Sequence, residues 1–275
     1  MFKRLTLALI CCAGIASAEP RLVYSGRVFI EDAGGLSGLE IGPDGRTGIT
    51  VSDRGEVFAI KVRRTNGELS SVNLTPWPNR SKIEGDVEGI ATNDAQTYFF
   101  SLEGPARVMS LSISGNLTTL PRHPDFAKMR SNRALESIAI DQNGTLYTLP
   151  EVAPDADNGF PLYAFKDQQW RLATILPSRG SFSVVGADFG PDNLLYLLER
   201  TVTALGFRTR VRRFDLAATD LGEETLLTTW PAYHDNLEGI SLWQDVNGAT
   251  RVTMISDDNF LMIQRNELVE YILQE

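Results

Sequence analysis

The sequence predicts an all-β protein, a single β-propeller built from four-stranded blades. Short apolar or alternating runs recur along the chain, separated by Gly, Pro, Asn and Asp, which is the pattern of strands and turns. No long stretch shows the i, i+3, i+4, i+7 apolar spacing of an amphipathic helix. A motif made of an acid, a small residue and an apolar residue returns about every 50 residues. A four-stranded unit of this length is typical of a propeller blade.

The clearest unit is a predicted β-hairpin that turns at Asn143-Gly144. The residues on either side of this turn form short apolar runs, and Asn-Gly between two such runs is a strong hairpin signal. Folding the chain at the turn brings Glu136, before the first run, beside Glu151, after the second. Both carboxylates are therefore expected on the same rim of the blade.

Similar units can be traced along most of the chain. They start at Leu36-Ser37-Gly38-Leu39, Val87-Glu88-Gly89-Ile90, Leu135-Glu136-Ser137-Ile138, a degenerate copy around Val185-Gly186-Ala187-Asp188, and Leu237-Glu238-Gly239-Ile240. An acid follows the second strand of each unit, at Asp53, Glu103, Glu151, Glu199 and Asp257. We predict five blades, with a strand at residues 22–30 completing the last one. A sixth blade divided between the two termini is the alternative.

Residues 1–18 are predicted to be a signal peptide outside the fold. Lys3 and Arg4 precede an apolar run over residues 5–15, and Ala16-Ser17-Ala18 is an A-x-A cleavage site. The apolar run is too short for a membrane span of about 20 residues. We therefore expect export to a bacterial periplasm or the exterior, with residues 19–275 forming one domain.

Cysteine usage and charge exclude several classes of function. Both cysteines, Cys11 and Cys12, lie in the predicted signal peptide, so the mature chain lacks disulfides and thiolate metal sites. The net charge of −9 becomes −11 when Lys3 and Arg4 are removed. A balance this acidic argues against nucleic acid or an anionic membrane as a partner and suits the binding of cations. We expect a monomer without a membrane span.

The repeated acids predict a metal site at one mouth of the propeller channel. The first strand of a blade lines the channel, so Glu88, Glu136 and Glu238 should converge there, with the acids that follow the second strands just outside. Hard oxygen ligands without Cys or clustered His indicate Ca²⁺. The predicted ligands are Asp53, Glu88, Glu136, Glu151, Glu238, Asp257 and Asp258. In the alternative interpretation, each acid hydrogen-bonds backbone amides at its own turn.

The repeats also resemble the phytase-like propeller family, whose members are described by an "esterase-like activity of phytase". The resemblance covers about residues 22–273. It is carried, beyond the unit starts, by Ser52-Asp53-Arg54-Gly55, Asp86-Val87-Glu88, Asn132-Arg133-Ala134-Leu135-Glu136, Leu198-Glu199-Arg200 and Asn236-Leu237-Glu238 with Ser256-Asp257-Asp258-Asn259-Phe260. The chain departs from the pattern at Ser137, where Gly is common, and at the fourth start, which lacks its Glu. The resemblance implies a secreted phosphoester or ester hydrolase in which Ca²⁺ binds substrate phosphate and activates water.

Arginines near these acids are candidates for binding phosphate. Arg54, Arg133 and Arg200 lie within three residues of a predicted metal ligand or rim acid, and guanidinium groups match phosphate geometry. Pairing with the neighbouring acids is the alternative. Glu136 is the residue on which we expect turnover to depend, and His234, four residues before Glu238, is a weaker candidate for a general base.

Two functions follow from these predictions. The first is a calcium-dependent hydrolase that acts on a small anionic or ester substrate, a phosphate ester or a related ester, at the acidic channel mouth. The alternative is a non-catalytic propeller, stabilised by calcium, that binds a ligand or a protein. A propeller fold supports both, and the sequence holds no unambiguous proton-transfer residue that would decide between them.

Overall fold

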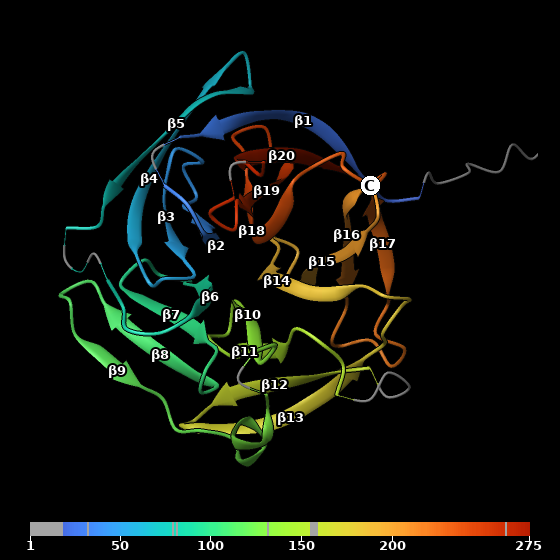
Figure 1. Ribbon diagram of the computed structural model, residues 1–275. Coiled ribbons are helices and arrows are strands. Elements are labelled where there is room, and N and C mark those ends of the chain that lie inside the picture. Colours follow the sequence, from blue (N-terminus) through green and yellow to red (C-terminus); the bar gives the residue numbers. More distant parts are fainter. Residues whose placement is uncertain are drawn as a thin grey trace, which may run out of the picture.

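The computed structural model describes residues 19–275 apart from residues 32, 79, 81, 131, 155–158 and 262. The predicted signal peptide, with Cys11 and Cys12, lies outside the described residues. In the described ranges, twenty strands form five four-stranded antiparallel sheets, arranged as blades around a central channel (Figure 1). The all-β class and the five-bladed propeller are confirmed, and the six-bladed alternative is wrong.

The strands of each blade follow one another from the channel outward. Blade 1 contains β2 (Leu36–Ile41), β3 (Thr47–Ser52), β4 (Val57–Thr65) and β5 (Glu68–Pro76). Blade 2 contains β6 (Val87–Ala91), β7 (Thr97–Leu102), β8 (Arg107–Ser112) and β9 (Leu117–Thr119). Blade 3 contains β10 (Leu135–Ile140), β11 (Leu146–Pro150), β12 (Phe160–Lys166) and β13 (Gln169–Leu176). Blade 4 contains β14 (Ser183–Phe189), β15 (Leu195–Thr203), β16 (Gly206–Phe214) and β17 (Glu224–Thr228). Blade 5 contains β18 (Asn236–Gln244), β19 (Thr250–Asp257), β20 (Asn266–Gln274) and β1 (Arg21–Ile30).

Helical structure plays a small part in this fold. A 3₁₀ helix, η1 (Pro124–Lys128), lies between blades 2 and 3, and Phe126 of this helix is buried. No helix in the described part of the chain is long and apolar enough to cross a membrane.

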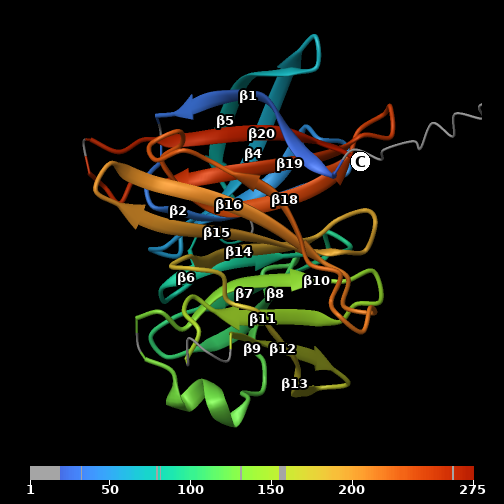
Figure 2. The same ribbon diagram turned by 90° about the vertical axis from the view of Figure 1, so that its right-hand side faces the viewer.

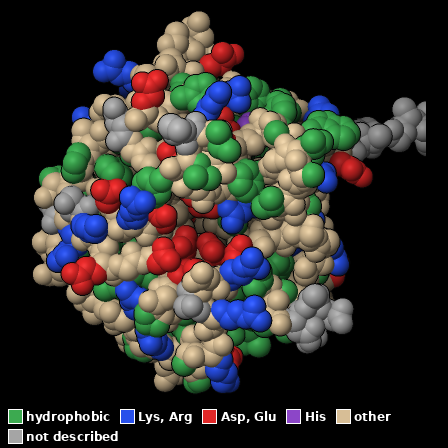
Figure 3. All heavy atoms as spheres, viewed as in Figure 1, with side chains coloured by type: hydrophobic (Ala, Val, Ile, Leu, Met, Phe, Trp, Pro, Cys, Tyr) green, Lys and Arg blue, Asp and Glu red, His purple; other side chains and the backbone are tan. Residues whose placement is uncertain are grey.

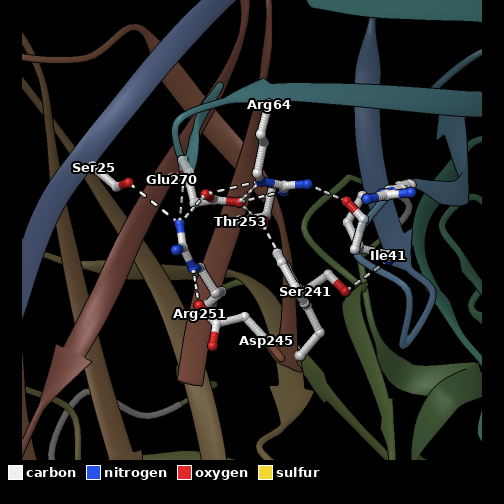
Figure 4. Close-up of polar contacts among 12 residues, drawn as sticks. Ser25, Ile41, Arg64, Ser241, Asp245, Arg251, Thr253 and Glu270 are labelled. Carbon is white, nitrogen blue, oxygen red and sulfur yellow. Dashed lines mark hydrogen bonds and ion pairs between the residues drawn. The ribbon is translucent and has the colours of Figure 1, made fainter. Parts of the chain in front are cut away.

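The ring is closed by the N-terminal strand and by a buried ion-pair network. β1 pairs antiparallel with β20, so the first strand of the chain is the outermost strand of the last blade (Figure 2), as predicted. Glu270 of β20 is 0% exposed and forms an ion pair with Arg64 of blade 1 (Figure 4). Glu270 also accepts hydrogen bonds from Arg251, at 2.8 Å, and from Thr253, at 3.3 Å. The N-terminal strand thus completes the last blade by backbone pairing, and side chains join the last blade to the first.

Apolar side chains fill each junction between neighbouring blades. Between blades 4 and 5, for example, Tyr196 and Leu198 pack with Val252 and Met254, and all four are fully buried. Such clusters form because side chains alternate between the two faces of a strand, and both faces of a blade are covered by its neighbours. The blades therefore hold the channel-lining strands in a fixed arrangement.

A β-bulge explains the repeated acid–small–apolar motif. The innermost strand of every blade pairs with its neighbour through a register shift at the same place, for example between Val87 and Gly89 in blade 2. The extra residue of a bulge is unpaired and its side chain is redirected. These extra residues, which we call the inner ring, are Ser37, Glu88, Glu136, Val185 and Glu238.

The small residue after the bulge is required by close approach between inner strands. A Cβ atom on Gly186 would lie 2.4 Å from the backbone oxygen of Glu238, and one on Gly239 would lie 3.0 Å from the backbone nitrogen of Leu39. Real Cβ atoms do not approach backbone oxygen as closely as 2.4 Å. The motif therefore combines a redirected side chain with room for the next blade.

Candidate metal centre at the channel mouth

Acidic side chains gather at one mouth of the channel. Figure 3 shows this mouth as a concentrated patch of Asp and Glu near the centre of the molecule. The patch contains the three glutamates of the inner ring, Glu88, Glu136 and Glu238, which influence one another's pKa values. The structure thus brings together the three channel-lining acids that the sequence predicted.

A second set of side chains surrounds the inner ring. In each blade, the inner-strand residue just before the bulge pairs with a residue of the second strand. The residues that directly follow these second-strand partners in the chain form the second set, which we call the outer ring. The backbone N–H of Asp53, for example, donates to the carbonyl oxygen of Gly35 at 2.7 Å. By register the outer ring is Asp53, Glu103, Glu151, Arg200 and Asp257.

The tightest group of acids lies in blade 2. One carboxylate oxygen from each of Asp86, Glu88 and Glu103 lies within 4.8 Å of the others, and we call these residues the acidic triad. Asp86 and Glu103 are side by side because the N–H of Glu103 donates to the carbonyl oxygen of Asp86 at 2.9 Å. Asp86 and Glu103 are not in the predicted ligand set. Their signal was present, since Glu103 follows a second strand and Asp86 stands two residues before Glu88.

Crowding and burial make Glu88 and Glu136 hard to ionise. Burial raises the pKa of Glu88 well above its usual range, and the nearby Glu238, Asp86 and Glu103 raise it further. Burial likewise raises the pKa of Glu136, helped by Glu88 and Glu238. Burial and desolvation disfavour an anion, and like charges add to this effect. The mouth is therefore a place where a bound cation would be strongly favourable.

The acids on the side of blades 1 and 5 have mixed surroundings. Oδ1 of Asp53 is buried and has no hydrogen-bond partner among the described residues. Burial, followed by the charge of Glu238, raises the pKa of Asp257 to about 7. Oδ1 of Asp258 instead accepts hydrogen bonds from the N–H groups of Gly35 and Phe260, at 3.0 and 3.1 Å. Asp258 thus binds backbone N–H groups, as expected if these acids stabilise turns and do not bind a metal.

The three predicted phosphate-binding arginines have different environments. Arg200 forms an ion pair with Glu238, and its Nη2 lies 3.6 Å from Oε1 of Glu151. Arg133 is 63% exposed, and its Nε lies 3.6 Å from Oε2 of Glu151. The guanidinium of Arg54 stacks on Phe260, 3.4 Å from the ring centroid. Arg133 and Arg200 are therefore at the acidic mouth, flanking one carboxylate.

The position of Glu199 corrects the sequence analysis. Glu199 was expected on the rim, but its side chain is 0% exposed and accepts hydrogen bonds from Arg210, at 2.6 Å, and Arg212, at 2.8 Å. In the register of blade 4, Arg200 holds the outer-ring position and Glu199 precedes it. A shift of one residue turns a strand side chain to the opposite face.

The position of His234 does not support a role as general base. Its side chain is 1% exposed, Nε2 lies 2.6 Å from the hydroxyl oxygen of Tyr271, and Nδ1 lies 3.4 Å from Oε1 of Glu267. Buried against β20, the imidazole does not reach a substrate at the channel mouth. His234 is therefore not part of the candidate site.

The donor chemistry of the mouth fits a hard divalent cation. The available atoms are carboxylate oxygens, which Ca²⁺ prefers, and one of them, Oδ1 of Asp53, is buried without a partner among the described residues. The channel itself has a free volume of only about 10 Å³, so a ligand would bind at the mouth and would not pass through. Asp86, Glu88 and Glu103 are the residues best placed to hold a cation.

Fold and site together define a five-bladed propeller with an acidic channel mouth. The family model described as "Phytase-like: Esterase-like activity of phytase" matches residues 31–260, and the chain belongs to this family. No curated protein matches the chain.

Solved structures share the fold at low sequence identity. The PQQ-bound aldose sugar dehydrogenase from Streptomyces coelicolor superposes with a TM-score of 0.54 and 11% identity, covering 94% of this chain and 99% of that one. A luciferin-regenerating enzyme gives a TM-score of 0.50 and 13% identity, with 91% and 95% coverage. At such identities these similarities concern the fold alone.

Proposed function

We propose that this protein is an exported, calcium-dependent hydrolase of phosphate esters or related esters. The observation that carries the proposal is the acidic triad of Asp86, Glu88 and Glu103, whose carboxylate oxygens approach within 4.8 Å. Three carboxylates at this distance repel one another unless protons or a cation compensate their charge. Family membership supports a hydrolase, because the family description names an esterase-like activity.

The residues of the mouth have separate roles in this proposal. Asp86, Glu88 and Glu103 would hold Ca²⁺, which when bound neutralises phosphoryl oxygens and lowers the pKa of a coordinated water. Arg133 and Arg200, on either side of Glu151, supply guanidinium groups for the oxygens of the substrate.

Glu136 is the proposed proton acceptor of the site. It lies among the other inner-ring acids, and burial followed by their charges raises its pKa well above the usual range. Ca²⁺ bound by Glu88 would offset part of this negative charge, so that Glu136 can ionise and accept a proton.

The test combines metal binding with activity. Residues 19–275 are purified, freed of metal with a chelator, and assayed on p-nitrophenyl phosphate, phytate and a short-chain carboxyl ester during a Ca²⁺ titration. We expect Ca²⁺ to restore turnover of at least one substrate, and Glu88→Gln to lower it at least 100-fold. Glu68→Gln is the matched control, because Glu68 is exposed on the outermost strand of blade 1.

The outcomes separate the two functions. Turnover that does not depend on Ca²⁺, or that is unchanged in Glu88→Gln, contradicts the proposed metal centre. Tight Ca²⁺ binding without turnover on the three substrates supports instead a calcium-stabilised propeller that binds a ligand or a protein. Export is tested separately, by fractionating bacteria that express the full-length chain and locating the processed protein.

A further inference from the structure

A pocket of about 540 Å³ lies beside the acidic mouth, on blade 3 and the segment that leads into it. Its lining is mixed: Met129, Pro150, Val152, Pro154 and Tyr163 are apolar, and four charged residues line it as well. The volume is in the range of pockets that bind small organic ligands. We call it the blade 3 pocket.

The blade 3 pocket adjoins the acidic mouth at Arg133 and Glu151. Pro150 and Val152 line the pocket and are the neighbours of Glu151 in the chain. Arg133 lines the pocket as well, and its Nε lies 3.6 Å from Oε2 of Glu151. The segment that carries Arg133 is held by the triad, since the N–H of Ala134 donates to Oε1 of Glu103 at 2.5 Å. Arg133 therefore belongs both to the lining of the pocket and to the acidic mouth.

One wall of this pocket is formed by packed aromatic side chains. The ring of Tyr163 packs edge-on against Phe126, with centroids 5.2 Å apart and an interplanar angle of 86°. The hydroxyl of Tyr163 donates to Oδ2 of Asp125 at 3.3 Å, and Asp125 lines the pocket as well. Lys128, Arg130 and Arg133 bring three cations to the lining of the pocket, and Lys128 and Arg130 are exposed.

We infer that the blade 3 pocket binds the organic group of the substrate, and that this group is apolar or aromatic while its phosphate lies at the mouth beside Arg133. The inference rests on the proposed function and names its substrate class: aryl or bulky apolar phosphomonoesters, in preference to polyhydroxylated ones. Hydroxyl groups pressed against Met, Pro and Val side chains would lose their hydrogen bonds to water without replacement.

The experiment compares two phosphomonoesters on the metal-loaded protein, 1-naphthyl phosphate and glycerol 2-phosphate. We measure kcat/KM for both, and Kd for both by isothermal titration calorimetry. For the native chain we expect 1-naphthyl phosphate to be favoured at least tenfold. Val152→Trp should lower this ratio at least tenfold by filling the pocket. Val246→Trp is the matched control, because Val246 is fully exposed in the turn before β19 and lies outside the pocket.

Binding and turnover fail in distinguishable ways. If the native chain binds 1-naphthyl phosphate more tightly and Val152→Trp abolishes this preference, the inference about the pocket is supported even when neither ester is hydrolysed. Only the proposed hydrolase function would then be wrong. Equal affinity for the two esters, or a preference that Val152→Trp leaves intact, overturns the inference whether or not the protein is a hydrolase. A preference that falls equally in Val246→Trp overturns it too.

Discussion

Arg200 of blade 4 forms an ion pair with Glu238 of blade 5, and it does so from the register position that an acid holds in each of the other four blades. In the same blade the inner-ring position is the apolar Val185. The mouth is therefore asymmetric, with the guanidinium of Arg200 on the side of blade 4 and the acidic triad on blade 2. This asymmetry suggests that Arg200 balances part of the negative charge and leaves the triad free to bind a cation.

The first prediction concerns the charge of Arg200. Arg200→Gln should strengthen Ca²⁺ binding about three- to tenfold, because a positive charge near Glu238, Glu136 and Glu151 opposes a second cation. The metal-free variant should at the same time melt at a lower temperature, because Glu238 loses its ion-pair partner. Calorimetric Ca²⁺ titration and thermal unfolding with chelator measure the two effects.

Two further variants control for this effect. Arg200→Lys keeps the charge and should change the Ca²⁺ affinity less than twofold. Arg46→Gln removes the same charge from an exposed position at the turn before β3, and it should leave the affinity unchanged if the effect is local. Weaker Ca²⁺ binding in Arg200→Gln would contradict the prediction and would place Arg200 among the residues that support the metal site.

The blade architecture was predictable from sequence, but the details of the site were only partly so. A spacing of about 50 residues and repeated turn signals predict blades directly. The repeated acid was also visible in three of the five units, whereas the bulge that redirects it was not, because a bulge depends on pairing with the next strand. Asp86 was missed for a related reason, since it lies outside the repeated motif and joins Glu88 and Glu103 through strand pairing.

The two wrong placements have physical causes of their own. Glu199 and Arg200 are adjacent, and only the strand register decides which of them faces the mouth. His234 is four residues from Glu238 in sequence, but contacts with Tyr271 and Glu267 of β20 bury it. Contacts between residues far apart in the chain leave no local pattern in the sequence.

The second prediction concerns the network that closes the ring. Glu270→Gln should lower the free energy of unfolding by about 3 kcal/mol, because it leaves Arg64 and Arg251 without their buried anion. Urea unfolding measures this change. Lys128→Ala is the control, since it removes an exposed ion pair with Asp125 and should cost less than about 0.5 kcal/mol. A loss below about 1 kcal/mol in Glu270→Gln would show that strand pairing alone closes the ring.

The third prediction concerns the close approach of inner strands. Gly186→Ala should destabilise the protein by about 2 to 4 kcal/mol, because its Cβ would lie 2.4 Å from the backbone oxygen of Glu238. Gly26→Ala on β1 is the matched control. Its Cβ would meet nothing nearer than 3.6 Å, so we expect a change of less than about 1 kcal/mol. Thermal unfolding compares the two, and similar melting temperatures would contradict the steric explanation of the motif.

The fourth prediction concerns a buried carboxyl pair at the other mouth of the channel. Oε1 of Glu40 in blade 1 accepts a hydrogen bond from the N–H of Thr92 in blade 2, at 3.1 Å. Oδ2 of Asp188 in blade 4 accepts one from the N–H of Leu242 in blade 5, at 2.6 Å. Burial raises the pKa of Asp188 to about 7, although hydrogen bonds from backbone N–H groups oppose the shift. Burial, and then the charge of Asp188, raises the pKa of Glu40 well above its usual range.

The sign of the pH dependence follows from these shifts. The folded protein binds the Asp188 proton more tightly than the unfolded chain, in which the pKa is about 3.9. The stabilisation is therefore complete below about pH 4 and is lost as the pH rises toward 7, amounting to on the order of 4 kcal/mol. Asp188→Asn, a neutral mimic that keeps the acceptor for Leu242, should flatten the fall in unfolding free energy between about pH 4.5 and 8. The control variant Glu68→Gln should leave this fall in unfolding free energy unchanged. Urea unfolding with chelator across this range measures both slopes, and equal slopes in Asp188→Asn and the native chain would mean that Asp188 is not the group that titrates.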